Sequence, residues 1–138
     1  MARILALDYG LKRTGIAVTD PLQIIATSLE TIQTPELFNY LKKYFLRDKV
    51  ECLVVGEPRN LNNTRVGISD EIDRFILRFV QEFPAIPVKR IDERFTSKIA
   101  QQTILAAGKN KKARRDKSIV DRISAVIILQ SYLENIQK

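Results

Sequence analysis

Acidic residues at three positions are the side chains best suited to chemistry in this chain. Asp8 closes the apolar run Ile4–Leu7, the pair Asp92-Glu93 follows a second apolar segment, and Asp121 stands early in the last one. An ionised carboxylate is costly to bury unless a cation or several hydrogen-bond donors meet it. Carboxylates gathered at one place would hold one or two divalent cations, activate water and stabilise the leaving oxygen of a phosphodiester.

Asp8 and the Asp92-Glu93 pair also have structural interpretations. An aspartate directly after a strand is typical of a turn, and this reading suits Asp8. Asp92-Glu93, followed by Arg94, fits a surface ion-pair cluster around Arg90. Neither position by itself decides between the two interpretations.

Asp121 has the sharpest structural alternative. Ser118 and Asp121 have the spacing of a capping box at the start of a helix. Against this, Asp121 shares a helical stripe with Ala125 and Ile128, a face that should be packed rather than solvated. A cap and a metal ligand do not exclude each other.

Composition excludes several catalytic classes. The chain has no histidine and a single cysteine, Cys52. Histidine general bases, Ser-His-Asp and Cys-His nucleophile systems, and zinc sites built from imidazole or several thiolates are therefore ruled out. A hydrolase is left with carboxylates, lysines and cations that prefer oxygen ligands, so Mg²⁺ or Mn²⁺ is the expected cofactor. Cys52 itself is expected to be a core residue.

The net charge of +7 favours a polyanionic partner, because basic proteins gain affinity for phosphate backbones through counterion release. Residues 109–117 concentrate this charge directly before Asp121, and Lys12 and Arg13 add to the expected surface. The segment has no aromatic residue, which argues against base stacking there. A solvated loop is the alternative. Its cations are Lys109, Lys111, Lys112, Arg114, Arg115 and Lys117.

Length and composition indicate one globular domain over residues 1–138, with 45% hydrophobic and 28% charged residues. No apolar leader precedes the first strand-like segment, and no apolar run is long enough to span a bilayer. The single cysteine fits a reducing compartment. A cytoplasmic protein with no membrane association is expected, and both a monomer and a homodimer remain open.

Hydrophobic periodicity predicts a mixed α/β sheet with helices on both faces. If the first, fourth and fifth strands are parallel, Asp8 and Glu93 reach one edge, and the last helix, packed across that edge, delivers Asp121. The expected strands are residues 3–9, 16–18, 24–32, 50–55 and 87–91. The first expected helix has Thr34 as its N-cap residue, and the second carries the apolar positions from Ile68 to Phe79. The third runs from Thr96 or Ser97, either of which can cap it, to Gly108, and the last is capped by Ser118.

The chain resembles the YqgF/RuvX family over most of its length. The motifs occur in the family's order, so the match is more specific than a single motif would be. The matching segments are LALDYGLKRTGIAVTDP, VVGEPRNLNNT, DERFTS and KKARRDKSIVDRISAVIILQSYL. One departure is clear: Glu57 and Arg59 stand where family members usually have apolar residues. This change would place an ion pair near the site or alter substrate contacts.

The resemblance implies a ribonuclease H-like fold, with a mixed five-stranded sheet, and metal-dependent cleavage of nucleic acid. Asp8 would be the first-strand ligand, Glu93 the acid of the DER motif and Asp121 the helix acid, with Asp92 as the alternative to Glu93. The implied substrate is the 5′ leader of precursor 16S rRNA, and the implied partners include ribosomal particles.

Three other functions compete with this one. The first is a Holliday junction resolvase that acts on branched DNA. The second is a non-catalytic RNA-binding factor for ribosome assembly, since sequence shows ligand types but not their geometry. The third is a phosphotransferase, because residues 5–18 also resemble the phosphate-binding hairpin of actin-like ATPases. Those enzymes bind nucleotide between two such domains, and the length of this chain disfavours them.

Overall fold

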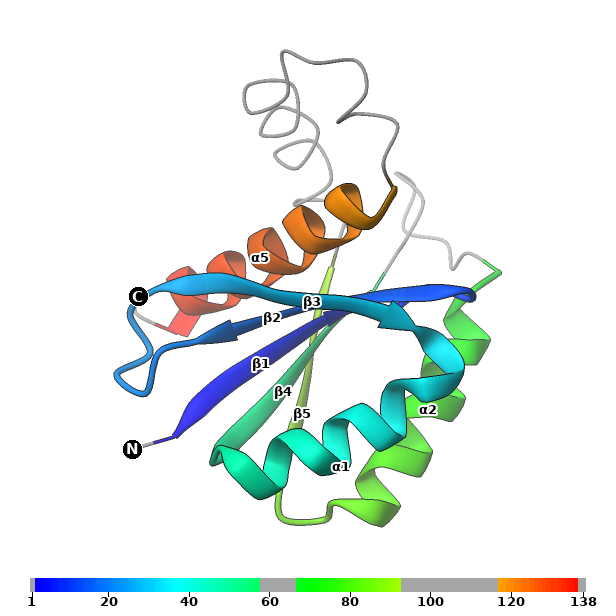
Figure 1. The fold of residues 1–138 in the computed structure, drawn as a ribbon, viewed down its shortest axis with the longest axis horizontal. Coiled ribbons are helices and arrows are strands. Elements are labelled where there is room, and N and C mark those ends of the chain that lie inside the picture. The colour runs from blue at the N-terminus through cyan, green and yellow to red at the C-terminus, as the bar shows by residue number, and fades with distance from the viewer. Residues whose placement is uncertain (1, 58–66, 93–116, 137–138) are drawn as a thin grey trace.

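The computed structural model describes residues 2–57, 67–92 and 117–136, which form a five-stranded sheet with helices on both faces (Figure 1). The strand order is β3-β2-β1-β4-β5. β1 pairs parallel with β4, as β4 does with β5, whereas β2 is antiparallel to both β1 and β3. The described elements are β1 (Arg3–Asp8), β2 (Arg13–Thr19), β3 (Ala26–Gln33), the 3-10 helix η1 (Thr34–Glu36), α1 (Leu37–Arg47), β4 (Val50–Glu57), α2 (Ser69–Glu82), β5 (Val88–Asp92) and α5 (Lys117–Ile136).

The central strand β1 is buried on both faces, as its continuous apolar run predicts. Ile4 and Ala6 pack toward α5, while Leu5 and Leu7 pack toward α1 and α2. All four side chains are at most 2% exposed. The mixed sheet with helices on both faces is therefore confirmed.

The two faces have different cores. On the α5 side, small sheet residues allow the helix to lie close to the strands. The buried members there are Ile4, Ala6, Ala17, Cys52, Val54, Ala125, Ile128, Leu129 and Leu133. The predicted core position of Cys52 is confirmed. On the other side, the core contains aromatic residues of α1 and α2. The ring of Phe45 in α1 lies 5.0 Å from that of Phe83, the residue that follows α2.

Several predicted boundaries need correction. β2 begins at Arg13 rather than at residue 16, and β3 begins at Ala26 because residues 20–25 form a turn. α5 begins at Lys117, so this lysine belongs to the helix rather than to the basic loop. The predicted polar loop after β4 and the predicted helix ending at Gly108 lie outside the described residues. Within the described part of the chain, no helix has the length and apolar character needed to cross a membrane.

The predicted helix cap at Thr34 is wrong. Gln33 is the N-cap residue of η1, and Glu36 is that of α1. The Thr34 hydroxyl instead donates a hydrogen bond to the carbonyl oxygen of Gly10, at 2.6 Å. The Thr34 side chain makes this long-range contact instead of capping the helix, because the turn after β1 lies close enough to η1 for the Gly10 carbonyl group to accept its hydrogen bond.

Candidate active site

The carboxyl ends of β1, β4 and β5 lie side by side because these strands are parallel neighbours. Each strand ends in an acid: β1 in Asp8, β4 in Glu57 and β5 in Asp92. Glu57 and Asp92 are register partners. We call this end of the sheet the carboxyl edge. Ligands of parallel α/β sheets bind outside such an edge, so it is the natural place for a site.

Asp8 stands at the end of the central strand, on the face that α5 covers. Side chains alternate along a strand, and Ile4 and Ala6 belong to the α5-side core. The Asp8 side chain is half-buried, and its register partner on β2 is Gly15. The predicted position of Asp8 at the end of a buried strand is confirmed, whereas its role as a metal ligand stays a prediction.

α5 crosses the sheet so that its first turns reach the carboxyl edge (Figure 1). Near its other end, the Tyr132 hydroxyl lies 3.8 Å from the Cys52 sulfur, early in β4. From Tyr132 back to Asp121 the helix rises about 16 Å, and β4 extends about 13 Å from Cys52 to Gly56. The two lengths are similar, so α5 is long enough to reach from Cys52 to the carboxyl edge.

Position 121 shares a helical stripe with two buried residues of α5. Ala125 and Ile128, four and seven residues later, are fully packed in the α5-side core. Because α5 begins at Lys117, Ser118 lies in its first turn rather than before it. These bounds do not support the capping-box interpretation of Ser118 and Asp121, and they leave the packed stripe as the stronger observation.

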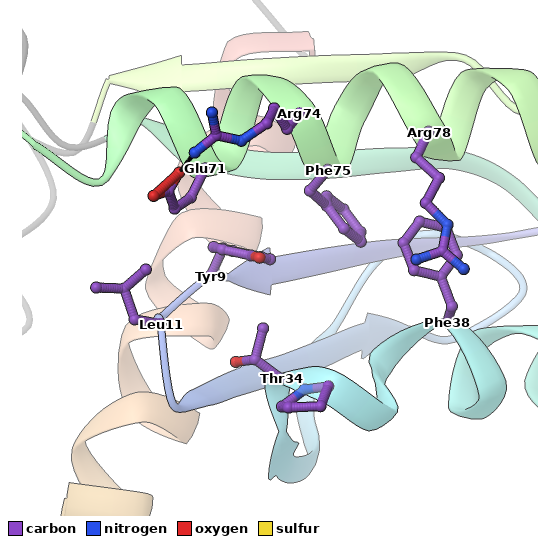
Figure 2. Close-up of a pocket in the computed structure, with 9 residues that line it drawn as sticks. Tyr9, Leu11, Thr34, Phe38, Glu71, Arg74, Phe75 and Arg78 are labelled. Carbon is purple, nitrogen blue, oxygen red and sulfur yellow. Dashed lines mark hydrogen bonds and ion pairs between the residues drawn. The ribbon is translucent and has the colours of Figure 1, made fainter.

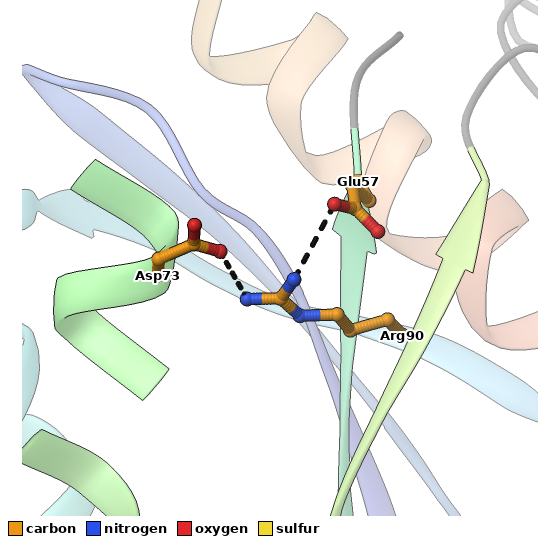
Figure 3. Close-up of polar contacts among 3 residues, drawn as sticks. All are labelled: Glu57, Asp73 and Arg90. Carbon is orange, nitrogen blue, oxygen red and sulfur yellow. Dashed lines mark hydrogen bonds and ion pairs between the residues drawn. The ribbon is translucent and has the colours of Figure 1, made fainter. Parts of the chain in front are cut away.

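Arg90 joins β4, β5 and α2 at the carboxyl edge (Figure 3). Its guanidinium donates to Glu57 Oε1 at 3.3 Å and to Asp73 Oδ1 at 2.5 Å. The Glu57 side chain is only 13% exposed. The ion pair expected from the unusual Glu57 is thus present. Both partners of Arg90 lie on the side of the sheet that α2 covers. Arg59, Glu93 and Arg94 lie outside the described residues.

The donors available at the carboxyl edge are carboxylate oxygens, which suit a hard divalent cation such as Mg²⁺ or Mn²⁺. Among the described residues, no group of three histidine, cysteine, aspartate or glutamate side chains lies close enough to hold a metal ion.

Lys12, in the turn after β1, and Arg13, the first residue of β2, are both exposed at the carboxyl edge. Thr34 ties this turn to η1: its backbone N–H donates to the Lys12 carbonyl oxygen at 2.9 Å, and its hydroxyl donates to Gly10. Because that hydroxyl proton is used, Thr14 Oγ1, 3.0 Å away and fully buried, donates to Thr34 Oγ1. Sequence patterns do not reveal this role of Thr34.

Gly10 gives the turn its tight path. A Cβ atom at this position would lie 2.2 Å from the Arg13 carbonyl oxygen. The basic residues 109–116 that would extend this positive surface lie outside the described part of the chain. Only Lys117, as the first residue of α5, is placed by the structure.

Known proteins are similar to this chain over nearly its whole length. Residues 2–135 match the sequence model of the RuvX family, described as Holliday junction resolvase. A protein of Christiangramia forsetii named "Putative pre-16S rRNA nuclease" is 55% identical over 96% of this chain and 98% of its own length. A protein of Porphyromonas gingivalis with the same name is 53% identical over 98% of each chain.

Solved structures show the same fold. Thermus thermophilus RuvC in complex with a Holliday junction substrate aligns over 97% of each chain, with a TM-score of 0.61 and 14% identity. A second structure of that RuvC aligns over 98% of this chain and 96% of its own, with a TM-score of 0.53 and 12% identity. RuvC has a ribonuclease H-like fold, so the expected fold class is confirmed. With the family match covering nearly the whole sequence, the chain belongs to the RuvX family of nucleases.

Proposed function

We propose that this nuclease hydrolyses phosphodiester bonds of structured RNA, with the 5′ end of precursor 16S rRNA as its substrate. The observation that carries the proposal is the carboxyl edge itself, where Asp8 ends the central strand beside the parallel ends of β4 and β5 and which the first turns of α5 reach (Figure 1). The names of the relatives from Christiangramia forsetii and Porphyromonas gingivalis supply the choice of RNA.

In this proposal Asp8, Glu93 and Asp121 together hold the cation. Residues of β5 alternate between the two faces: Val88 packs toward α1 and α2, and Ile91 packs toward α5. If this alternation continues past Asp92, residue 93 falls on the α5 face, the face of Asp8. The pattern therefore favours Glu93 over Asp92 as the third ligand.

Bound Mg²⁺ or Mn²⁺ supplies a water of lowered pKa and countercharge for the leaving oxygen of the phosphodiester. The protein holds the reacting groups in position. Asp8 ends the central strand of the sheet, which pairs with β2 on one side and with β4 on the other. Lys12, Arg13 and the basic segment 109–117 then attract and orient the phosphate backbone.

A four-way DNA junction is the second candidate substrate. The description of the RuvX family model as Holliday junction resolvase is the specific observation that favours it. The carboxyl edge by itself suits either nucleic acid, because both present the same phosphodiester to the same carboxylates.

One experiment tests both substrates and the assignment of Asp8. The purified parent chain, Asp8→Asn and Asp20→Asn are offered precursor 16S rRNA and a four-way DNA junction, with and without Mn²⁺. Asp20→Asn is the matched control, since it makes the same change at the far end of the sheet. Asp8→Asn should lower cleavage roughly a hundredfold or more, because a cation at such a site contributes several kcal/mol, while nucleic-acid binding stays close to that of the parent.

Each outcome of this experiment supports a different conclusion. Cleavage of the rRNA by the parent and by Asp20→Asn, but not by Asp8→Asn, supports the proposal. Preferential cleavage of the DNA junction would make branched DNA the substrate and would leave the assignment of the site unchanged. Binding of RNA with no Mn²⁺-dependent cleavage by the parent would refute catalysis and favour a non-catalytic assembly factor.

A further inference from the structure

A pocket of about 390 Å³ opens on the α1/α2 side of the carboxyl edge, between the turn after β1, η1 and α2 (Figure 2). Ligand pockets in proteins start at about 300 Å³, so this one suits a single small group. It has an aromatic wall formed by Tyr9, Phe38 and Phe75, and two arginines, Arg74 and Arg78, at its α2 side. The site proposed above uses none of these residues.

The aromatic wall is built on the core. The Phe75 ring lies 5.2 Å from the Tyr9 ring and 5.1 Å from the Phe38 ring, centroid to centroid. Phe75 is 6% exposed, so it fixes the other two rings from behind. The aromatic wall is thus packed against the core on the α1/α2 side.

The charged side chains of the pocket are of both signs. The Arg78 guanidinium lies 4.0 Å from the centre of the Phe38 ring, where its flat face extends the aromatic surface. Arg74 pairs with Glu71 across one turn of α2. Both arginine side chains stay more than 60% exposed, with donors that can reach a phosphate.

This lining matches a nucleotide better than an isolated phosphate or an apolar ligand. Bases stack on aromatic rings and on guanidinium planes, arginine donates to phosphate, and a carboxylate such as Glu71 accepts from base amino groups. An isolated phosphate would leave the aromatic wall unused, and an apolar ligand would leave the remaining arginine donors unused.

The pocket is also next to the proposed catalytic position. Tyr9 follows Asp8 directly, so their Cα atoms are about 3.8 Å apart. Asp8 lies on the α5 face of the sheet, whereas Tyr9 packs with the core on the α1/α2 face. A nucleic-acid strand that passes over the end of β1 would therefore meet both.

We propose that this pocket binds one unpaired nucleotide of the RNA, adjacent to the bond cleaved at Asp8. The inference rests on the proposed function for the identity of the RNA. The base stacks on the aromatic wall and on Arg78, and the phosphate faces Arg74 and Arg78. A base held in a continuous duplex cannot enter, so the pocket selects single-stranded nucleotides beside the cleavage site.

Binding measurements test this selection. Each variant is made in the Asp8→Asn chain so that the RNA stays intact, and its affinity is measured for a single-stranded RNA and for a fully paired RNA duplex. Arg78→Ala and Arg74→Ala should each weaken binding of the single strand about fivefold or more and leave duplex binding within about twofold. Arg47→Ala is the matched control, because Arg47 also lies over a ring, that of Tyr44, but does not line this pocket.

The proposed nucleotide pocket would be refuted if the affinities for the single strand and the duplex fell to the same degree, or if Arg78→Ala and Arg47→Ala had equal effects on binding. A second readout needs no variant of the pocket: 5-iodouridine placed beside the cleavage site should crosslink to Tyr9 or Phe38. Crosslinks confined to other residues would also overturn it. The parent is assayed for Mn²⁺-dependent cleavage of the same RNA, so a failed nuclease proposal is recognised separately from a failed pocket.

Discussion

The two ends of the sheet use the same residue types for different purposes. At the end opposite the carboxyl edge, Asp20 follows β2 and closes the turn into β3. Its carboxylate accepts hydrogen bonds from the backbone N–H groups of Leu22, Ile24 and Ile25, at 3.2, 2.9 and 2.8 Å. Asp20 is therefore an aspartate whose charge is used by the turn itself.

Other polar groups at that end also tie chain segments together. The Arg3 side chain pairs with Asp48 at 3.4 Å and donates to the Thr19 carbonyl oxygen at 3.0 Å. Gln23, at the left-handed φ of 61°, donates to the Ala2 carbonyl oxygen at 2.9 Å. These contacts fasten the start of β1 to the neighbouring turns.

Asp8 also follows an apolar strand, yet it occupies a different place in the sheet. Asp20 lies between two antiparallel strands at one side of the sheet, whereas Asp8 ends the central strand beside the parallel ends of β4 and β5. Residue type and local pattern are alike at the two positions. Topology is what distinguishes a candidate ligand from a turn residue.

Gly10→Ala, a change at the carboxyl edge, is expected to have the largest effect of the variants that compare the two ends of the sheet. The added methyl group would overlap the Arg13 carbonyl oxygen, so the turn that follows Asp8 must move. A displacement of about 1 Å at a catalytic group costs roughly a hundredfold in rate, so kcat/KM on the precursor rRNA should fall by about 10- to 100-fold. The melting temperature and the far-UV circular dichroism check that the fold survives, and parental turnover would show that the turn does not position the site.

Thr34→Val tests the hydrogen bonds that hold the same turn. The change leaves the fully buried Thr14 hydroxyl without its acceptor and removes the donor to Gly10. An unpaired buried hydroxyl costs about 1–3 kcal/mol, so the free energy of unfolding in urea should fall by about that amount.

The double variant Thr14→Val/Thr34→Val sharpens this prediction. Because it removes both hydroxyls of the pair, it should regain part of the loss. Additive losses in the double-mutant cycle would mean that the two threonines do not act as a pair.

The fold was predictable because each strand and helix carries its burial pattern locally. Ile4 to Leu7 are apolar at every position, which indicates a strand covered on both faces, and the spacing of Ile72, Phe75 and Phe79 indicates a helix with one buried face. The place of Asp8 at the end of the sheet that the first turns of α5 reach (Figure 1) follows from that order of elements.

Long-range polar contacts were not predictable in the same way. The hydroxyl of Thr34 reaches Gly10, and Arg90 reaches Asp73, only because the folded chain brings distant segments together. Helical periodicity correctly marks Phe38 and Phe75 as core positions, but it cannot show that the core opens beside Tyr9. The mistaken cap at Thr34 has the same origin, since a local pattern was overruled by a tertiary contact.

Asp20→Asn is expected to have the smallest effect, and it changes only the end of the sheet opposite the carboxyl edge. Backbone hydrogen bonds, that from Ile25 first, lower the pKa of Asp20 below its ordinary value. A folded-state pKa below the unfolded value of about 3.9 means that the ionised carboxylate stabilises the fold above about pH 4, and that this contribution is lost as the pH falls through the lowered pKa. Urea unfolding of the parent and of Asp20→Asn should therefore differ slightly at pH 7 and converge at pH 3, with cleavage of RNA unchanged at pH 7. A difference in stability that widens toward pH 3, or a loss of cleavage in Asp20→Asn, would show that the two ends of the sheet are not independent.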